Sequence, residues 1–340
     1  MSNQGLPLVS ICIPAYNAAP FIAETLESAL AQDYAPLEVI VSDDASTDAT
    51  LKIVQTYEGR GVRVLTQERN LGMHANWNAV IRASRGKYVC KLDADDLLAP
   101  SYVSSMVPVL EAHPRVAFAH CACRLIDLEG HVLGLERSVH GSFIRPGLQE
   151  WRRYVLGPRA VNIVMLRRAA FDAVGGYDER FAYSGDWKMH RDLLRFGDVF
   201  YHDHLLASYR LHALGKKGLT LLAAKEGLMH FGDMEQHWPS GLPGKERLLL
   251  KARRQWATML VYGLAQSEAA EAEAILEYLP LYGSFLWPRV LARLVRGGGA
   301  DILCRYLHYK RRLRQGVKRL FYQSRPGCVS QRPGATAPED

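Results

Sequence analysis

The segment 91–98, KLDADDLL, places three carboxylates, Asp93, Asp95 and Asp96, directly after the apolar run 88–90. A turn followed by a helix cap would explain one or two of them, because aspartate is favoured at both kinds of position. A third carboxylate so close adds repulsion that a divalent cation would relieve, and oxygen ligands are those that Mg²⁺ and Mn²⁺ prefer. The cluster therefore indicates a divalent metal site, provided that the surrounding sequence supplies a matching ligand.

Strand-like and helical segments alternate along the chain up to about Arg124. Strands are expected at 9–13, 37–41, 62–65, 88–92 and 116–119, and helices at 19–32, 48–57, 73–83 and 101–112. This alternation predicts an α/β fold with a mainly parallel sheet flanked by helices. Ligands of such sheets bind at the carboxyl ends of the strands, so the residues that follow each strand are candidates for the site.

Polar side chains follow two further strands at the same edge of the expected sheet. The first strand ends in Pro14, Tyr16 and Asn17, and the second ends in Asp43 and Asp44. A carboxylate after the second strand could hydrogen-bond a ribose hydroxyl, and an aromatic ring could stack on a base. The sequence has no G-x-G-x-x-G loop and no Walker lysine motif, which disfavours a dinucleotide or a P-loop triphosphate site.

Other polar positions fit a structural role as well as a functional one. Asn70 lies in a glycine turn that could be a loop or a ligand contact, and both interpretations stay open. Asp186 is expected in the first turn of a helix, where the dipole stabilises a carboxylate. His202 and His204 share one face of a strand, but the further ligands of a zinc site are missing at recognisable spacing.

Composition describes an ordinary packed protein. The chain has 340 residues, 48% of them hydrophobic, and six cysteines without a CxxC pair, as expected of reduced core thiols in the cytoplasm. No secretory signal is recognisable in the first ten residues, and the longest apolar stretches are about half of the ~20 residues that a membrane-spanning helix needs. The net charge of +7 comes largely from residues 289–325.

Three segments in this order, VSICIPAYNAAPFIAETLESALAQDY, VIVSDDASTDAT and NLGMHANWNAVIRASRGKYVCKLDADD, resemble the family 2 glycosyltransferases with a GT-A fold. The resemblance runs from about Leu8 to about His212. It implies an inverting enzyme whose sheet binds a nucleotide diphosphate-sugar, usually a UDP-sugar. It also implies an Asp-x-Asp motif that holds the ribose and a divalent cation, Mn²⁺ or Mg²⁺, on the diphosphate.

The resemblance assigns roles residue by residue. It implies donor binding by Pro14, Tyr16, Asn17, Asp43, Asp44, Asn70, Asp93 and Arg210, metal binding by Asp93, Asp95 and His212, and base catalysis by Asp186. The family usually has a Glu-Asp pair at the base, whereas this chain has Gly185 and Asp186. The polymer synthases of the family carry a Gln-x-x-Arg-Trp motif, which here reads Arg-Arg-Gln-Trp at 253–256, so addition of one or a few sugars is expected.

Residues past about Leu219 lie outside the resemblance. We expect a catalytic domain at 1–218, a helical extension at 219–323 and a disordered tail at 324–340. The basic helix expected at 288–322 either packs on the catalytic domain or binds an anionic membrane surface, where a lipid-linked acceptor would be found. Nucleic acid is a less favoured partner, because no base-reading motif accompanies the charge.

The sequence therefore predicts a cytoplasmic glycosyltransferase, peripheral on the inner face of the cell membrane if the basic helix binds there. The expected setting is the assembly of cell-surface polysaccharide or glycolipid on a carbohydrate or lipid-linked hydroxyl acceptor. Two alternatives remain: a nucleotidyltransferase on a similar sheet, and a catalytically silent protein that binds nucleotide-sugars.

Overall fold

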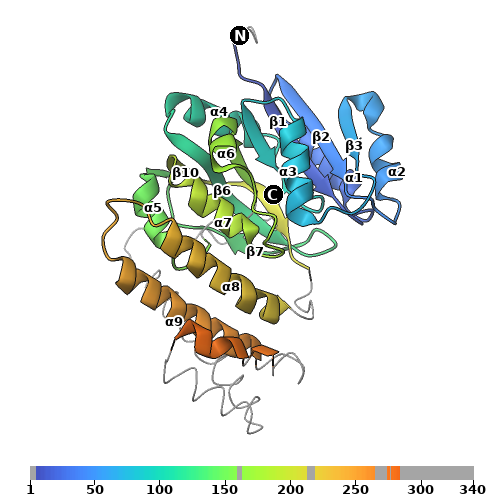
Figure 1. Ribbon diagram of the computed structural model, residues 1–340. Coiled ribbons are helices and arrows are strands. Elements are labelled where there is room, and N and C mark those ends of the chain that lie inside the picture. Colours follow the sequence, from blue (N-terminus) through green and yellow to red (C-terminus); the bar gives the residue numbers. More distant parts are fainter. Residues whose placement is uncertain (1–4, 159–162, 213–218, 265–273, 276, 284–340) are drawn as a thin grey trace, which may run out of the picture. The chain divides into compact units, whose positions relative to one another are not determined.

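The computed structural model describes residues 5–158, 163–212, 219–264, 274–275 and 277–283 (Figure 1). The chain divides into two compact units, Met1–Trp256 and Ala257–Asp340. The first unit holds the whole sheet that the structure describes. Within the second unit, the described residues are the end of one helix, the helical residues 274–275 and 277–278, and a short 3₁₀ turn at Leu279–Tyr282 followed by residue 283.

The described strands of the first unit form one sheet with the order β3-β2-β1-β4-β9-β6-β10-β5, with β7 on β6 and β8 on β10. Their bounds are β1 Val9–Ala15, β2 Leu37–Asp43, β3 Val62–Thr66, β4 Tyr88–Lys91, β5 Leu97–Leu98, β6 Val116–Ile126, β7 Val132–Glu136, β8 Phe143–Arg145, β9 Val164–Arg167 and β10 Asp198–Arg210. The run β3-β2-β1-β4 is parallel throughout, and β6 pairs with β10 in parallel. Strand β9 is inserted antiparallel between β4 and β6.

Helices of the first unit lie on both faces of this sheet, with α1 and α4 on one face and α3 on the other (Figure 1). Their bounds are α1 Ile22–Leu30, α2 Thr50–Gln55, α3 Met73–Ala83, α4 Tyr102–Ala112, α5 Gly147–Tyr154, α6 Arg168–Val174, α7 Gly185–Leu193, α8 Leu219–Gln236 and α9 Lys245–Leu264, with a 3₁₀ turn at Glu58–Arg60. The alternation of side chains along a strand divides β1 between the two faces. Ile11 joins the core under α1 and α4, whereas the Cys12 thiol donates to the carbonyl of Val80 in α3 at 3.8 Å.

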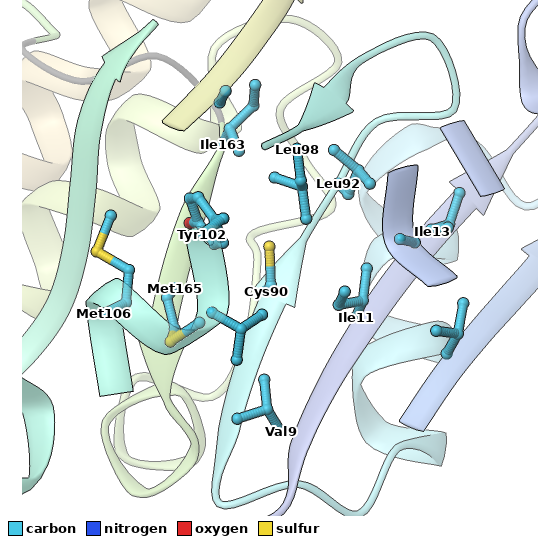
Figure 2. Close-up of a cluster of buried hydrophobic side chains, with 14 of the residues drawn as sticks. Val9, Ile11, Ile13, Cys90, Leu92, Leu98, Tyr102, Met106, Ile163 and Met165 are labelled. Atoms are coloured by element: carbon cyan, nitrogen blue, oxygen red, sulfur yellow. The ribbon is translucent and has the colours of Figure 1, made fainter. Parts of the chain in front are cut away.

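The face of the sheet under α1 and α4 is the hydrophobic core (Figure 2). Its side chains are fully or almost fully buried and come from neighbouring strands and from α4; they include Val9, Ile11, Ile13, Cys90, Leu92, Tyr102, Met106 and Met165. Burial of one such side chain contributes about 1.5–3 kcal/mol, so this core fixes the strands that carry the site. The four cysteines among the described residues are buried free thiols, as expected.

Several expected elements differ in length from those observed. Strands β1 and β2 continue two residues past the expected ends, to Ala15 and Asp43. The strand expected to carry His202 and His204 is the long strand β10, Asp198–Arg210. Helix α1 starts at Ile22 rather than 19, because the side chains of Asp48 and Thr50 accept the Ala19 and Ala18 amides at 3.1 and 2.7 Å and hold that segment as a turn.

The first compact unit ends at Trp256, and the catalytic domain expected at 1–218 stays a prediction. Helix α8 and the first part of α9, up to Trp256, belong to the first compact unit. The basic helix expected at 288–322 and the tail expected at 324–340 lie outside the described residues. Among the helices that the structure describes, none combines the length and the apolar character that a bilayer crossing requires.

Candidate active site

The carboxyl ends of β1, β2 and β4 meet at one edge of the sheet. Ala15 pairs with Asp43 and Pro14 with Ser42, and Cys12 pairs with Lys91 at the end of β4. We call this the strand-end edge and define it by residues 14–17, 42–46 and 93–96. It gathers the polar segments that follow three separate strands.

The two aspartates after β2 have different environments. Asp44 accepts the backbone N–H groups of Leu71 at 2.7 Å and Gly72 at 3.1 Å, so its carboxylate holds the loop before α3. Asp43 accepts the N–H of Ser46 at 3.0 Å through Oδ2, whereas its Oδ1 is buried without a hydrogen-bond partner. A buried carboxylate oxygen without a partner is costly. Asp43 is therefore better placed than Asp44 to bind a ligand.

The other residues expected to bind the donor lie around this aspartate. The Tyr16 side chain is 50% exposed at the end of β1. Asn17 has a φ of 50° and accepts the N–H of Thr47 at 2.8 Å, which ties the β1 end to the β2 end. Asn70 accepts the N–H of Gly72 at 3.0 Å within its own turn. Asn17 and Asn70 thus shape the edge, and Tyr16 offers an open aromatic face.

The three aspartates after β4 point to three different partners. Asp93 forms an ion pair with the fully buried Lys91 at 2.7 Å. Asp95 Oδ2 lies 2.5 Å from His212 Nε2. Asp96 is fully buried and accepts the backbone N–H of Arg210 at 2.8 Å. Burial raises the pKa of Asp96 well above its usual range, and the neighbouring charges of Asp93 and Asp95 raise it further.

Arg210, expected on the diphosphate, is buried at the end of β10. Its Nε donates to the carbonyl of Asp95 at 2.8 Å, Nη1 donates to the carbonyls of Asp127 and Leu128 at 2.9 and 3.0 Å, and Nη2 pairs with Glu24 at 2.7 Å. All three nitrogens therefore hold protein groups. In this structure Arg210 therefore fixes the backbone of the loop after β4 through the Asp95 carbonyl.

Asp95 and His212 fit a divalent cation by the chemistry of their donors. A carboxylate oxygen and an imidazole nitrogen already converge there, and the crowding of Asp93, Asp95 and Asp96 is relieved by positive charge. Asp93, the third expected ligand, is paired with Lys91 instead. Among the described residues a closer trio exists at Asp127, Glu129 and His131, but the Asp127 carboxylate accepts the amides of its own exposed turn at 3.0 and 2.8 Å.

Asp186 occupies the first turn of α7, as expected, and is partly exposed. Its Oδ1 accepts the N–H of Trp187 at 2.7 Å. Burial raises the pKa of Asp186, while that hydrogen bond and the Lys91 charge lower it and the Asp93 charge raises it. Asp186 therefore belongs to the same electrostatic cluster as Lys91 and Asp93, although α7 and β4 are far apart in the chain.

The presence of glycine at position 185, directly before Asp186, is explained by the space available there. A Cβ atom on Gly185 would lie 2.4 Å from Nε2 of His74 and 2.6 Å from its Cε1, so no larger side chain fits there. His74 Nδ1 lies 2.5 Å from the carbonyl of Phe181, to which it must donate, and burial lowers the pKa of the ring. The buried Nε2 of His74 has no hydrogen-bond partner. A histidine from α3 takes the space that an acidic neighbour of Asp186 would need.

Sequence reasoning missed Lys91 and His74. Lys91 stands in the apolar run YVCKL, and a lysine at a buried strand position was a usable signal, because charged side chains are rarely buried without a partner. Its ammonium group lies 3.9 Å from the centre of the Trp77 ring, on the α3 face. His74 gave no signal, because only the fold brings it to Gly185.

Solved structures with this fold define the class. The chain resembles TarS of S. aureus (residues 1–349, in complex with UDP-GlcNAc), with a TM-score of 0.57, 16% identity, and 85% of this chain and 92% of that chain covered. It also resembles the mannosyltransferase PcManGT of Pyrobaculum calidifontis in complex with GDP-Man and Mn²⁺, with a TM-score of 0.55, 19% identity, and 89% and 88% covered. The expected GT-A glycosyltransferase fold is confirmed.

The family follows from the sequence comparisons. The family model "Glycosyl transferase family 2" matches residues 10–175. Chondroitin synthase of Escherichia coli is 39% identical over 129 residues, which are 38% of this chain and 19% of that protein. An uncharacterized glycosyltransferase of Haemophilus influenzae is 26% identical over 216 residues, 62% of this chain and 67% of that protein. The family match over residues 10–175 and these glycosyltransferase relatives support a family 2 glycosyltransferase with a GT-A fold.

Proposed function

We propose that this chain is an inverting, metal-dependent glycosyltransferase that moves a sugar from a nucleotide diphosphate-sugar to a hydroxyl group of an acceptor. The observation that carries the proposal is the convergence of four features at the strand-end edge. These are the open ring of Tyr16, the partnerless oxygen of Asp43, the Asp95–His212 pair, and Asp186 beside Lys91 and Asp93.

The nucleotide lies on the β1–β2 part of the edge. Tyr16 stacks on the base, and Asp43 Oδ1 accepts a hydrogen bond from the nucleoside. Asn17, Asp44 and Asn70 act by holding the backbone that surrounds it, and Pro14 lies in the same part of β1 opposite Ser42. Two similar structures are complexes with UDP-GlcNAc and GDP-Man, which supports a nucleotide-sugar donor, and we propose a UDP-sugar.

The diphosphate lies over β4 and the end of β10. Asp95 and His212 would hold Mn²⁺ or Mg²⁺, and Asp93 lies beside them. A bound cation supplies positive charge to the leaving diphosphate. Arg210 holds the Asp95 carbonyl, and its guanidinium adds positive charge from behind the loop.

Asp186 acts as the base. Because Oδ1 accepts the Trp187 N–H, Oδ2 is the oxygen that receives the proton of the acceptor hydroxyl. A raised pKa makes this carboxylate a stronger base, and base catalysis of this kind contributes about 10²–10⁴-fold. Attack by the acceptor on the face opposite the leaving diphosphate inverts the anomeric centre.

We further propose the assembly of cell-surface polysaccharide or glycolipid as the setting, with a carbohydrate or lipid-linked acceptor. The Escherichia coli relative is named as a chondroitin synthase, which supports a polysaccharide context. A cytoplasmic location, peripheral on the membrane through the basic segment, stays a proposal, because that segment lies outside the described residues.

Cleavage of nucleotide-sugars tests this function. The full chain is incubated with UDP-GlcNAc, UDP-glucose or GDP-mannose, with Mn²⁺ or with EDTA, and release of the nucleoside diphosphate is measured. We expect release from one donor with Mn²⁺ and loss of that release in EDTA. Tight donor binding without release under any condition would favour the silent binding protein. Release of pyrophosphate in a parallel reaction that supplies UTP or GTP and a sugar 1-phosphate would favour a nucleotidyltransferase.

A further inference from the structure

A buried glutamate from α8 holds the segment that leads into the base. Glu226 is 2% exposed, and its Oε1 accepts the N–H groups of Ala182 at 2.6 Å and Tyr183 at 2.9 Å. Its Oε2 accepts both the N–H of Ser184 at 2.8 Å and the Oγ–H of Ser184 at 2.6 Å. One carboxylate therefore binds three consecutive backbone amides just before Gly185 and Asp186. We call residues 181–184 the base loop.

The carboxylate is itself held by a chain of buried hydrogen bonds whose direction can be deduced. Ser184 gives its one hydroxyl proton to Glu226, so His230 Nε2, at 2.8 Å from Oγ, must donate to that oxygen. His230 Nδ1 is then unprotonated and accepts from Arg191 Nη1 at 3.2 Å. Arg191 also pairs with Asp233, and burial lowers the pKa of His230, which agrees with a neutral ring.

The other end of the base loop is held from the opposite side. His74 of α3 donates to the carbonyl of Phe181 at 2.5 Å, and its ring packs where a side chain at 185 would lie. The base loop is thus fixed by side chains of α3 and α8, which lie about 150 positions apart in the sequence, rather than by sheet hydrogen bonds.

We propose that Glu226 is a positioning residue for the transfer reaction: by binding the amides of the base loop it sets the direction of Asp186 toward the acceptor. This inference rests on the proposed function. Helix α8 lies beyond residues 10–175 that match the family model, so the role belongs to a part of the chain that the family match does not reach. The hydrogen bonds of Glu226 go to residues 182–184 of the base loop, so it acts through that loop.

Replacement of Glu226 by glutamine has a defined consequence. One of the two accepting oxygens becomes an amide N–H₂ that faces N–H or O–H donors, so two of the four hydrogen bonds are lost and two donors are left buried. The loop is expected to loosen while the strand-end edge keeps its register. A misplacement of about 1 Å at the reacting group reduces rate by about 10²-fold in enzymes.

The test measures kinetics and hydrogen exchange on the full chain. In Glu226→Gln, kcat for Mn²⁺-dependent hydrolysis of UDP-GlcNAc or GDP-mannose, whichever the wild type cleaves, should fall about 10–100-fold while KM for the donor stays within about twofold. Exchange of the amide protons of residues 182–184 should become faster. Glu235→Gln is the matched control, because Glu235 lies on the same helix in an exposed ion pair with Arg253 at 2.6 Å.

Distinct results separate this inference from the proposed function. Unchanged exchange at residues 182–184 in Glu226→Gln, or kcat equal to that of Glu235→Gln, contradicts the role of Glu226. A wild type that cleaves no nucleotide-sugar contradicts the proposed function, while faster exchange at the same amides would still show that Glu226 holds the loop. If Glu226→Gln does not fold, Ser184→Ala removes one donor to Glu226 and should lower kcat in the same direction; unchanged kcat there overturns the inference.

Discussion

The strand-end edge and the base loop are positioned in different ways. At the edge, the ladders between β1, β2 and β4 set where Tyr16, Asp43 and Asp93 lie, and these ladders run through the hydrophobic core. The base loop has no such ladder and depends on His74 and Glu226, two side chains on separate helices. Donor binding should therefore tolerate changes near α7 and α8, whereas the proton transfer should be sensitive to them.

The largest expected effect comes from replacing Asp186, because this change should lower the rate of transfer without changing donor binding at the strand-end edge. Asp186→Asn keeps the size of the side chain and the oxygen that accepts the Trp187 N–H, but it cannot take up a proton. We expect the transfer rate to fall about 10²–10⁴-fold with donor affinity unchanged. Single-turnover kinetics and calorimetry on the folded variant measure the two quantities. A rate within about tenfold of wild type would place the base elsewhere.

A second change acts on the edge alone. Asp95→Ala removes one of the two converging donors of the proposed metal site, so donor affinity in Mn²⁺ should fall at least about tenfold. Titration of the donor with and without Mn²⁺ measures this fall. Glu129→Ala, which removes an exposed carboxylate from the β6–β7 turn, serves as the control. Equal Mn²⁺-dependent affinity in wild type and Asp95→Ala would show that Asp95 binds no metal.

A third change tests the packing of the base loop. Gly185→Ala drives a methyl group into the His74 ring and should destabilise the fold by about 1–3 kcal/mol, measured by chemical denaturation. Gly232→Ala in α8 is the matched control, because a Cβ there meets open space and alanine favours a helix by about 1 kcal/mol over glycine. Equal stability of the two variants would mean that His74 does not fill the space beside Gly185.

The smallest expected effect is a displacement of the pH profile. The rate should rise with pH as Asp186 loses its proton, and because its pKa is raised, the midpoint should lie above the ordinary value of about 3.9 for aspartate. The facing Lys91 charge lowers this pKa and the Asp93 charge raises it, so Lys91→Met should move the midpoint further up. If Lys91→Met leaves the midpoint of the pH profile unchanged, the Lys91 charge does not affect the pKa of Asp186.

The difference between the strand-end edge and the base loop also explains which features could be predicted from the sequence. Strands β1, β2, β3 and β4 follow from apolar runs bounded by polar turns, and their parallel order brings Asp43 and Asp95 to one edge. The choice of Asp43 over Asp44 could not be made, because it depends on which carboxylate the amides of the loop before α3 reach. Arg210 was expected on the diphosphate, yet its donors hold carbonyls of distant loops that no local pattern reveals.

The residues that hold the base loop could not be predicted from the sequence for a similar reason. His74, Glu226 and Gly185 meet through contacts across more than 40 positions of sequence, and each looks ordinary in its own helix. Among the residues that were missed, only Lys91, a lysine in a buried strand, could have indicated the charge cluster beside Asp186 from the sequence.

The stereochemistry of donor cleavage tests both regions in one measurement, because it depends on donor binding at the strand-end edge and on the base Asp186. Proton NMR follows the anomeric signal of the sugar released from UDP-GlcNAc or GDP-mannose by the full chain with Mn²⁺, before mutarotation. Attack by an activated hydroxyl or water on the face opposite the diphosphate predicts that the α-linked sugar appears first as the β-anomer. First appearance of the α-anomer, or no cleavage of any nucleotide-sugar in Mn²⁺ or Mg²⁺, would contradict an inverting transferase whose base is Asp186.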